Sequence, residues 1–388
     1  MTTVDRLNVI HVAGTKGKGT TCAFIDSFLR AHSKRTSFPS KVGLYTSPHL
    51  VYPEERIRIN FEPLPRDLFV KYVFEVDDVL SFGNQRQIEL RPRYLQFFAL
   101  LAFHTFIKEG VDATIIEAHH GGEYDSTNIV QKPCVTAITT LGLDHVKQLG
   151  STIDSIAWHK GGIFKPGAAS ISAKQKSPAF EVLLERAAAQ GNRLQVPHMD
   201  DNIPGELLQA VQLKPEVQRI NCTVALAVVD AFLKKAPLSK YPKYRLSRSD
   251  ITQGIQNFSW PGRFQIVVKG KHQWYLDSAH NEMSVSVAAG WFIEASGLKR
   301  YEFRWFFIED TNIHTLRDKL TNYPNILIFS MITDARDAAA VIRRLANSFA
   351  GTKIRHVIVT SYMRDKDSLD SKNGLFVNDN PGFYACLL

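Results

Sequence analysis

"VIHVAGTKGKGTT", residues 9–21, joins a short apolar run to a glycine-rich loop with two lysines, and a helix-compatible stretch follows it. Glycines allow backbone N–H groups to turn toward an anion, and a helix N-terminus adds partial positive charge. In such a loop Lys18 can reach terminal phosphates and the Thr20 hydroxyl can ligate Mg²⁺. The strict spacing G-x-x-x-x-G-K-[ST] is not met, because Val12 takes the first glycine position and Gly19 separates Lys18 from Thr20. The stretch predicts a phosphate site, and the alternative is a tight, solvated turn.

The composition indicates a globular protein with anionic partners. The chain has 388 residues, 44% hydrophobic and 22% charged, which is enough for two domains. Its net charge of +9 favours anions, but the 47 basic residues are spread along the chain, so we expect a small molecule and no nucleic acid. Neither a signal peptide nor an apolar run long enough for a membrane span is present. We expect a cytoplasmic protein without a membrane partner, with a mitochondrial location as the alternative; its oligomeric state stays open.

The hydrophobic pattern alternates between short strands and helices. Such alternation predicts an α/β fold with a largely parallel sheet. The sequence pattern changes near residue 260, where "WPGRF" precedes a predicted hairpin around Gly270 and a second series of strands. We therefore place a domain boundary between residues 261 and 262. The buried strands are expected at 7–13, 41–46, 111–118 and 134–141, a helix at 100–110, and the later strands at 301–308, 325–331 and 353–360.

Motifs spread along the chain resemble one enzyme family. The loop "HVAGTKGKGTT" is similar to the nucleotide loop of the folylpolyglutamate synthase and dihydrofolate synthase family, a branch of the Mur ligases, in which the extra glycine is habitual. The supporting motifs follow in order: "LYTSPHLVYPEERIRIN" (44–60), "YDSTNIVQKP" (124–133), "LGLDHVKQLGSTIDSIAWHKGGIFKPG" (141–167), "WPGRFQ" (260–265) and "LDSAHNEMS" (276–284). The resemblance implies a P-loop ATPase-type central ligase domain over 1–261 and a smaller Rossmann-like α/β domain over 262–388.

The resemblance also implies a reaction. Members of the family join a carboxylic acid to an amino acid with ATP and Mg²⁺, through an acyl phosphate that the amine then attacks. This chemistry requires metal ions and cations to neutralise phosphate charge, and it requires exclusion of water. A small-molecule acid and an amino acid such as L-glutamate are therefore the expected substrates.

The resemblance assigns roles to particular residues. It implies nucleotide contacts from Gly14, Thr15, Gly17, Lys18, Gly19, Thr20, Gln218, Asn221, Arg263 and Asp277. It implies metal ligation by Thr20, Ser47 and Glu117 for one ion and by His145 for a second, and catalytic roles for Lys18, His145, Lys160 and His280. Lys160 aligns with a lysine that is carbamylated in the family. Closure over the acyl phosphate, hinged at "WPGR", is a further hypothesis.

The sequence departs from the family pattern in four places. The family usually has E-V-G-x-G-G where this chain has Glu117-Ala118-His119-His120-Gly121-Gly122-Glu123, which puts two imidazoles near the metal and the acid. We take His119, His120 and Asp125 as substrate-side candidates, and neutral variation in a loop is the alternative. The chain also begins almost at the first strand, has a short C-terminal portion, and carries Ser278 where the family usually has glycine.

Three functions stay open at this stage. The first is a ligase that extends folate with glutamate, and the second is a ligase of the same mechanism that has diverged to another acid or amine. The third is a nucleotide-binding homologue without catalysis, which the presence of Lys18, Glu117, His145, Lys160 and Arg263 disfavours. The first two rank nearly level, with a slight preference for a folate-synthase-like ligase.

Overall fold

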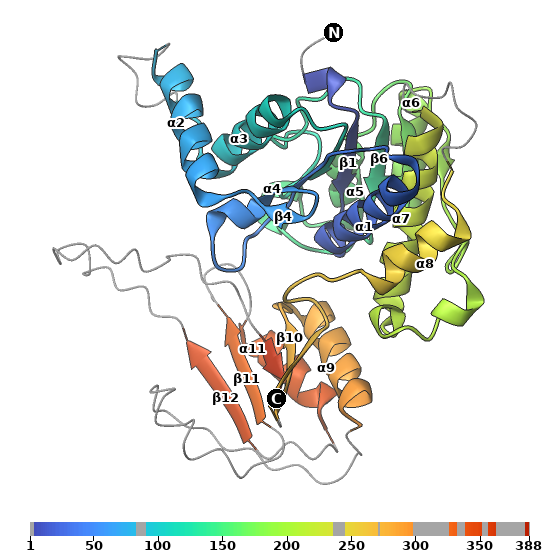
Figure 1. The fold of residues 1–388 in the computed structure, drawn as a ribbon. Coiled ribbons are helices and arrows are strands. Elements are labelled where there is room, and N and C mark those ends of the chain that lie inside the picture. Colours follow the sequence, from blue (N-terminus) through green and yellow to red (C-terminus); the bar gives the residue numbers. More distant parts are fainter. Residues whose placement is uncertain are drawn as a thin grey trace, which may run out of the picture. The chain divides into compact units, whose positions relative to one another are not determined.

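The computed structural model describes residues 4–82, 91–235, 245–270, 272–297, 326–331, 338–350, 356–361 and 385–387 (Figure 1). The chain folds as two compact units, Met1–Phe258 and Ser259–Leu388, and each is described by itself. The strand expected at 301–308 lies outside the described residues. The assignment of 1–261 to a ligase domain and of 262–388 to a Rossmann-like domain stays a prediction.

A mixed, mainly parallel sheet is the centre of the first unit. Its strands follow the order β4-β3-β2-β5-β1-β6-β7-β8, and neighbours from β2 to β8 pair in parallel. The parallel strands are β1 (Val9–Ala13), β2 (Val42–Tyr45), β5 (Ala113–Glu117), β6 (Val135–Ile138), β7 (Ala169–Ser172) and β8 (Leu194–Gln195). The strands expected at 7–13, 41–46, 111–118 and 134–141 are therefore confirmed, as is the α/β fold class.

Two short antiparallel strands close one edge of this sheet. They are β3 (Ile57–Ile59) and β4 (Glu62–Pro63), and β3 pairs with β2. The sequence pattern does not predict them, because segments of two and three residues carry too little alternation to indicate a strand.

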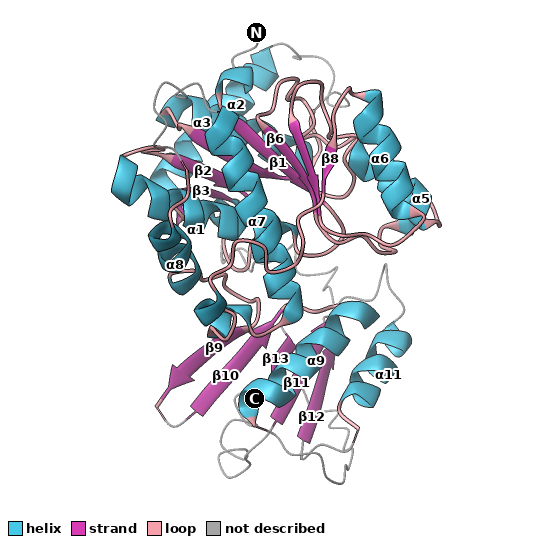
Figure 2. Ribbon diagram, turned by 90° about the vertical axis from the view of Figure 1, so that its right-hand side faces the viewer, coloured by secondary structure: helices cyan, strands magenta, loops and turns pink. Residues whose placement is uncertain are grey.

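Helices cover both faces of the sheet (Figure 2). α1 packs against α7 and α8 and against β1, β2 and β5, whereas α2 packs against α3 and α5 against α6. The helix expected at 100–110 is confirmed as the second half of α3. The helices are α1 (Lys18–Thr36), α2 (Arg66–Phe82), α3 (Tyr94–Glu109), α4 (Val146–Leu149), α5 (Ile153–Gly161), α6 (Ala179–Ala189), α7 (Glu216–Lys235) and α8 (Arg248–Gln256). Short 3₁₀ turns occur at Val4–Arg6, Pro53–Arg56, Gly205–Leu207 and Val211–Leu213.

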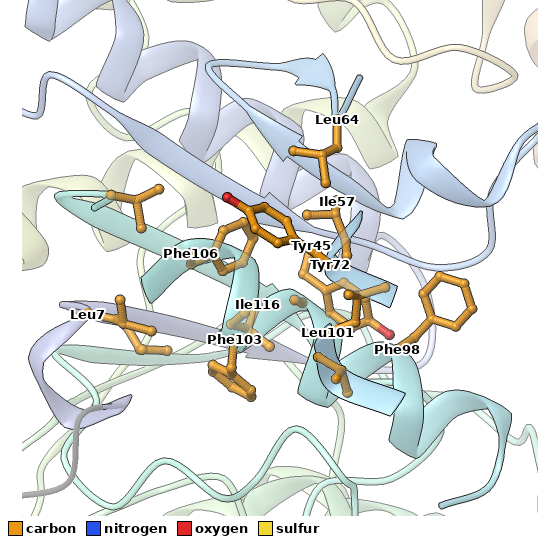
Figure 3. Packing of buried hydrophobic residues seen from close by; sticks show 14 of the residues in the cluster. Leu7, Tyr45, Ile57, Leu64, Tyr72, Phe98, Leu101, Phe103, Phe106 and Ile116 are labelled. Carbon is orange, nitrogen blue, oxygen red and sulfur yellow. The ribbon is translucent and has the colours of Figure 1, made fainter. Parts of the chain in front are cut away.

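The apolar core between α3 and the sheet fixes the strand ends that carry the site. Phe106 is fully buried and lies close to Gly43, where an added Cβ would meet its ring at 2.7 Å. Tyr45 and Ile116, which are register partners in β2 and β5, pack into the same cluster (Figure 3). Burial of an aromatic side chain of this kind stabilises the fold by about 1.5–3 kcal/mol. None of the described helices has both the length and the hydropathy needed to cross a bilayer.

The second unit has a smaller mixed sheet. The hairpin expected around Gly270 is confirmed by β9 (Gln265–Lys269) and β10 (His272–Asp277), which pair in antiparallel fashion. The strands expected at 325–331 and 353–360 correspond to β11 (Ile326–Met331) and β12 (His356–Ser361), a parallel pair. β13 (Ala385–Leu387) lies antiparallel between β11 and β10. Two helices, α9 (Glu282–Ser296) and α11 (Ala338–Ser348), contact each other, and α9 contributes Phe292 to the core of the unit.

Candidate active site at the carboxyl end of the central strands

The glycine-rich loop is held by its backbone. Gly14 and Gly17 have φ values of +150° and +83°, and a Cβ at Gly17 would meet Asn221 Oδ1 at 2.2 Å. The amides of Thr15 and Lys16 both donate to the carbonyl of Thr140 at 3.0 Å. Those two amides are therefore already used within the protein, so an anion would bind further along, at the start of α1.

The first turn of α1 presents amides to the end of β5. Thr21 N makes the first intrahelical bond, to Gly17 O at 2.8 Å, so the amides of residues 18–20 precede the helical ladder. Lys18 Nζ lies 4.0 Å from Glu117 Oε1, and the amide of Ser47 donates to Glu117 Oε2 at 3.0 Å. The fold thus brings together the predicted residues Lys18, Ser47 and Glu117 from three different segments.

Gln218 and Asn221 extend this group from α7. Both are buried, at 2% and 6% exposure, and Asn221 lies against the backbone of Gly17. Gln218 Oε1 is a buried acceptor without a hydrogen-bond donor among the described residues. Buried polar atoms of native proteins are nearly always paired, so this oxygen is suited to a donor from a ligand such as a nucleotide.

Lys160 is a buried lysine that contacts the glycine-rich loop. Its side chain is 1% exposed, and Nζ donates to Gly14 O at 2.9 Å and to His120 O at 2.8 Å. Burial, followed by the nearby charge of Lys18, lowers the pKa of Lys160 from 10.5 to about 7. A neutral amine has two N–H bonds and can satisfy both carbonyls, and its lone pair makes it a nucleophile near neutral pH.

His119 and Asp125 form a buried network with Tyr45. Tyr45 Oη and His119 Nε2 are 2.6 Å apart, and His119 Nδ1 lies 3.2 Å from Asp125 Oδ1. Asp125 Oδ2 also accepts the amides of His119 and His120 at 2.9 and 3.1 Å. Burial alone would raise the pKa of Asp125, but the hydrogen bond and charge of His119 and the hydrogen bonds from Thr127 hold that pKa well below its usual value.

His120 points to a different neighbour from that of His119. His120 Nδ1 lies 3.2 Å from His145 Nε2, and the two ring centroids are 4.3 Å apart. Burial first, and then the proximity of His120, lowers the pKa of His145 to about 4. Burial and then the charge of His119 lower the pKa of His120. Both imidazoles are therefore mainly neutral at neutral pH, so that in their contact one ring N–H donates to the lone pair of the other ring.

The predicted residues of the second unit form a group of their own. Asp277 is 5% exposed and accepts the amide of Phe264 at 3.0 Å; burial raises its pKa, and the charge of Arg263 opposes that rise. His280 Nδ1 donates to Ser278 O at 2.7 Å. The charge of Arg263 thus acts on Asp277. The roles assigned to Arg263, Asp277 and His280 stay predictions.

The predicted metal ligands suit a hard cation. Thr20, Ser47 and Glu117 offer oxygen atoms, which Mg²⁺ prefers, whereas His145 offers nitrogen. Among the described residues no three His, Cys, Asp or Glu side chains gather into a ready metal site. An ion there would need further oxygen atoms from phosphate or water, as is usual for Mg²⁺.

Three contacts at this site were not predicted from the sequence. Lys16 Nζ forms an ion pair with Asp144 Oδ2 at 2.9 Å, Thr140 O accepts the loop amides, and Tyr45 holds His119. For the Lys16–Asp144 ion pair, the sequence offered only a second lysine in the loop and an aspartate beside His145. Without the strand order, that signal could not indicate a contact.

Solved structures show which fold this is. A structure described as an FPGS–AMPPCP complex aligns with a TM-score of 0.69 and 25% identity over 92% of this chain and 91% of that one. Folylpolyglutamate synthase of Mycobacterium tuberculosis complexed with ADP and AMPPCP aligns with a TM-score of 0.67 and 21% identity, over 92% and 89% of the two chains. The chain has the α/β fold of the Mur ligases.

Curated relatives identify the family. The chain is 41% identical to folylpolyglutamate synthase of Neurospora crassa over 297 residues, which are 75% of this chain and 55% of the relative. It is 38% identical to a probable folylpolyglutamate synthase of Schizosaccharomyces pombe over 370 residues, 94% and 68% of the two chains. No family model matches the sequence. The chain belongs to the folylpolyglutamate synthase family, and it spans about half to two thirds of the length of these curated relatives.

Proposed function

We propose that the chain is an ATP-dependent acid–amino acid ligase of the folylpolyglutamate synthase type. It activates a carboxylic acid as an acyl phosphate and joins it to an amino acid such as L-glutamate. The observation that carries the proposal is the placement of Lys18 Nζ 4.0 Å from Glu117 Oε1, at the open first turn of α1. A cation, helical amides and a carboxylate at one point are what a metal–nucleotide phosphate requires.

Each of these groups has a separate task. The amides of residues 18–20 and the Lys18 ammonium bind the transferred phosphate and stabilise the charge that develops on it. Glu117, Thr20 and Ser47 would hold Mg²⁺, which would supply positive charge against the phosphates. Gln218 Oε1 accepts a hydrogen bond from the nucleotide. Relatives solved with AMPPCP and with AMPPCP and folate support ATP and a folate-like acid as substrates.

Lys160 is the proposed site of a carbamate. A buried lysine with a pKa near 7 reacts with dissolved CO₂, and the product is an anion that can organise cations. One hydrogen bond to Gly14 O or His120 O is then lost, because a carbamate nitrogen keeps one N–H. Native mass spectrometry with and without bicarbonate, with Lys160→Arg as the control, tests this. A bicarbonate-dependent mass increase in the wild type that is absent from Lys160→Arg supports it, and a wild-type mass that is the same with and without bicarbonate contradicts it.

The same mechanism with another acid is the second candidate function. It is favoured by the imidazoles of His119 and His120, which lie two and three residues beyond Glu117 where the family pattern has E-V-G-x-G-G. His119 is buried and His120 is exposed, so His120 is the one placed to meet a substrate. A His119→Val and His120→Gly double variant tests this; an unchanged acid preference contradicts it.

The experiment that tests the function is ADP release with Mg²⁺ and ATP. The purified chain is given tetrahydrofolate plus glutamate, each alone, and a panel of other carboxylic acids with and without amino acids. Turnover that requires both folate and glutamate supports the first candidate, and turnover with another acid supports the second. Measurable ATP affinity without turnover on any acid would contradict both and leave a nucleotide-binding homologue. The cytoplasmic location and the roles of Arg263, Asp277 and His280 stay predictions.

A further inference from the structure

The loop between β2 and β3 brings Ser47 to the end of β5. The loop is closed at its base, because the amide of Thr46 donates to the carbonyl of Arg56 at 3.0 Å. Ser47 is half-buried, and its amide donates to Glu117 Oε2 at 3.0 Å. The direction of the Glu117 carboxylate therefore depends on where this loop places Ser47.

Glu55 organises the middle of the loop. Its carboxylate accepts the amides of Leu50, Val51 and Tyr52, at 3.0, 3.0 and 2.8 Å. These bonds fix the backbone of the middle of the loop, but none of them involves Ser47. The segment next to Ser47 is held by a separate contact.

That contact joins two buried side chains, His49 and Arg56. Arg56 Nε donates to His49 Nδ1 at 2.8 Å, and the two residues are 5% and 3% exposed, His49 being the first. The guanidinium carbon of Arg56 also lies 5.5 Å from the ring centre of Tyr94 and 5.1 Å from that of Phe98. Both rings belong to α3, and Phe98 is part of the apolar cluster between α3 and the sheet (Figure 3). Arg56 thus anchors the segment next to Ser47 on α3.

The pair of His49 and Arg56 is poorly suited to stabilise the fold. Arg56 Nη1 and His49 Nε2 are buried, and neither has a hydrogen-bond partner among the described residues. Because His49 Nδ1 accepts from Arg56, a neutral His49 carries its proton on Nε2, so both orphaned atoms are donors. A buried donor without an acceptor lowers stability, and two apolar side chains of similar shape would avoid that cost. The effect that remains to the pair is the placement of the loop.

We propose that His49 and Arg56 are positioning residues for Ser47. The pair holds the Ser47 amide where it binds Glu117 Oε2, while Glu117 Oε1 lies 4.0 Å from Lys18 Nζ. Without that amide, the carboxylate of Glu117 turns toward Lys18, and the two charges satisfy each other instead of a metal–nucleotide. The inference rests on the proposed function, because only a chain that binds ATP with Mg²⁺ uses this arrangement.

The first test follows the Ser47 amide in the full chain without any ligand. Hydrogen exchange of peptides that contain Ser47 is compared between the wild type and the double variant His49→Leu with Arg56→Met. This variant removes the hydrogen bond and both orphaned donors, so its thermal midpoint should stay close to that of the wild type. We expect these peptides to lose protection from exchange. Unchanged protection in the double variant would overturn the proposal.

The second test measures binding of AMPPCP, an ATP analogue, by calorimetry with Mg²⁺ and with EDTA. We expect the double variant to bind AMPPCP about tenfold more weakly with Mg²⁺, since loss of an outer partner of a metal ligand costs about 10–100-fold. Its affinity in EDTA should be unchanged, and an equal loss in both conditions would overturn the proposal. A wild type without affinity for AMPPCP would contradict the proposed function instead, and hydrogen exchange would still decide the positioning role.

Two further variants separate positioning from a general loss of structure. His49→Asn places an amide oxygen where Nδ1 lies, so it can accept from Arg56 and should keep the protection of Ser47 and the Mg²⁺-dependent affinity. His104→Leu removes another histidine, whose Nε2 lies 2.8 Å from Glu75 Oε2, and should leave both readouts unchanged. A loss in His49→Asn equal to that in the double variant would overturn the proposal. So would an equal loss in His104→Leu, which would indicate a general effect of lost stability.

Discussion

The turn after β1 and the turn after β5 lie at the ends of neighbouring strands, whose register pairs Val12 with Glu117, but they are held in different ways. Backbone groups give the first turn its shape, through positive φ angles at Gly14 and Gly17 and amides bonded to Thr140 O, and the side chain of Lys160 adds a hydrogen bond to Gly14 O. Side chains hold the second.

In the turn after β5, Asp125 accepts two amides and His119 bridges Asp125 to Tyr45. In the first turn a Cβ at Gly14 would meet Thr139 Oγ1 at 1.9 Å and one at Gly17 would meet Asn221 Oδ1 at 2.2 Å, so neither position has room for a side chain. A turn held by side chains can accept new residues as long as their polar atoms are paired. The first turn thus keeps glycine where a side chain would clash, whereas the second carries two histidines whose ring nitrogens have polar partners.

The strongest test of the first turn is Lys18→Ala. If this turn binds the transferred phosphate, the variant should lose about 10²–10³-fold in turnover, because a preorganised charge is removed from the transition state. ADP release measures this, with the thermal midpoint as a check on folding. Lys34→Ala, an exposed lysine of the same helix, is the matched control and should keep full turnover. Equal turnover in Lys18→Ala and Lys34→Ala would remove this turn from the mechanism.

Gly17→Ala asks whether the backbone alone holds the first turn. Gly17 combines φ +83° with a Cβ position 2.2 Å from Asn221 Oδ1, and we expect a loss of about 2–3 kcal/mol in the free energy of unfolding. Gly110 has φ +62° with open space around its Cβ position. Gly110→Ala should therefore lower the free energy of unfolding by only about 1 kcal/mol. Urea unfolding compares the two.

Addition of Asn221→Ala to Gly17→Ala should restore part of the lost free energy, because it removes the atom that the new Cβ meets. An equal loss in Gly17→Ala and Gly110→Ala would show that close packing contributes nothing there.

Asp125→Asn asks whether side chains hold the second turn. We expect the free energy of unfolding at pH 7 to fall by about 2 kcal/mol, because a charged acceptor of several hydrogen bonds is replaced by an amide. Asp78→Asn, an exposed change on α2, is the control and should have little effect. If both variants unfold alike at pH 7, the carboxylate does not hold this turn.

The stabilisation by Asp125 should also depend on pH. The folded pKa is lowered, so the contribution is present above the unfolded pKa of about 4 and is lost as the pH falls below it. The difference between the wild type and Asp125→Asn should therefore shrink in acid. Urea unfolding at pH 7 and at pH 3 measures this difference, and a constant difference would exclude a charge effect.

Lys160 links the two turns, since it donates to Gly14 O and to His120 O. Its folded pKa is about 7 and its unfolded value 10.5, so the unfolded state binds more protons between these values and stability rises with pH. The contribution is at most about 1.4 kcal/mol per pH unit. Urea unfolding from pH 7 to 10 should show a flatter curve for Lys160→Met than for the exposed control Lys174→Met. Parallel curves would mean that Lys160 is charged in the folded protein.

Much of the first turn could be predicted from the sequence. The strand at 9–13, the glycines and Lys18 are adjacent in the chain, and the helix expected after the loop is present as α1, which begins at Lys18, slightly earlier than the expected stretch. The predicted nucleotide residues Gln218 and Asn221 were found only through the family motif, because nothing local relates α7 to a loop about 200 residues earlier. The edge strands β3 and β4 were missed because they are short.

The sequence by itself determined the α/β alternation, the glycine-rich turn and the residue types that suit phosphate and a hard cation, because these depend on neighbours along the chain. Only the tertiary structure decided which distant groups meet: Lys18 with Glu117, Tyr45 with His119, and His120 with His145. These pairs depend on the strand order β2-β5-β1-β6. The apolar sequence of a strand does not specify this order, because each strand would be buried equally well beside several of the others. Packing of the helices against both faces selects one order, and with it the chemistry of the site.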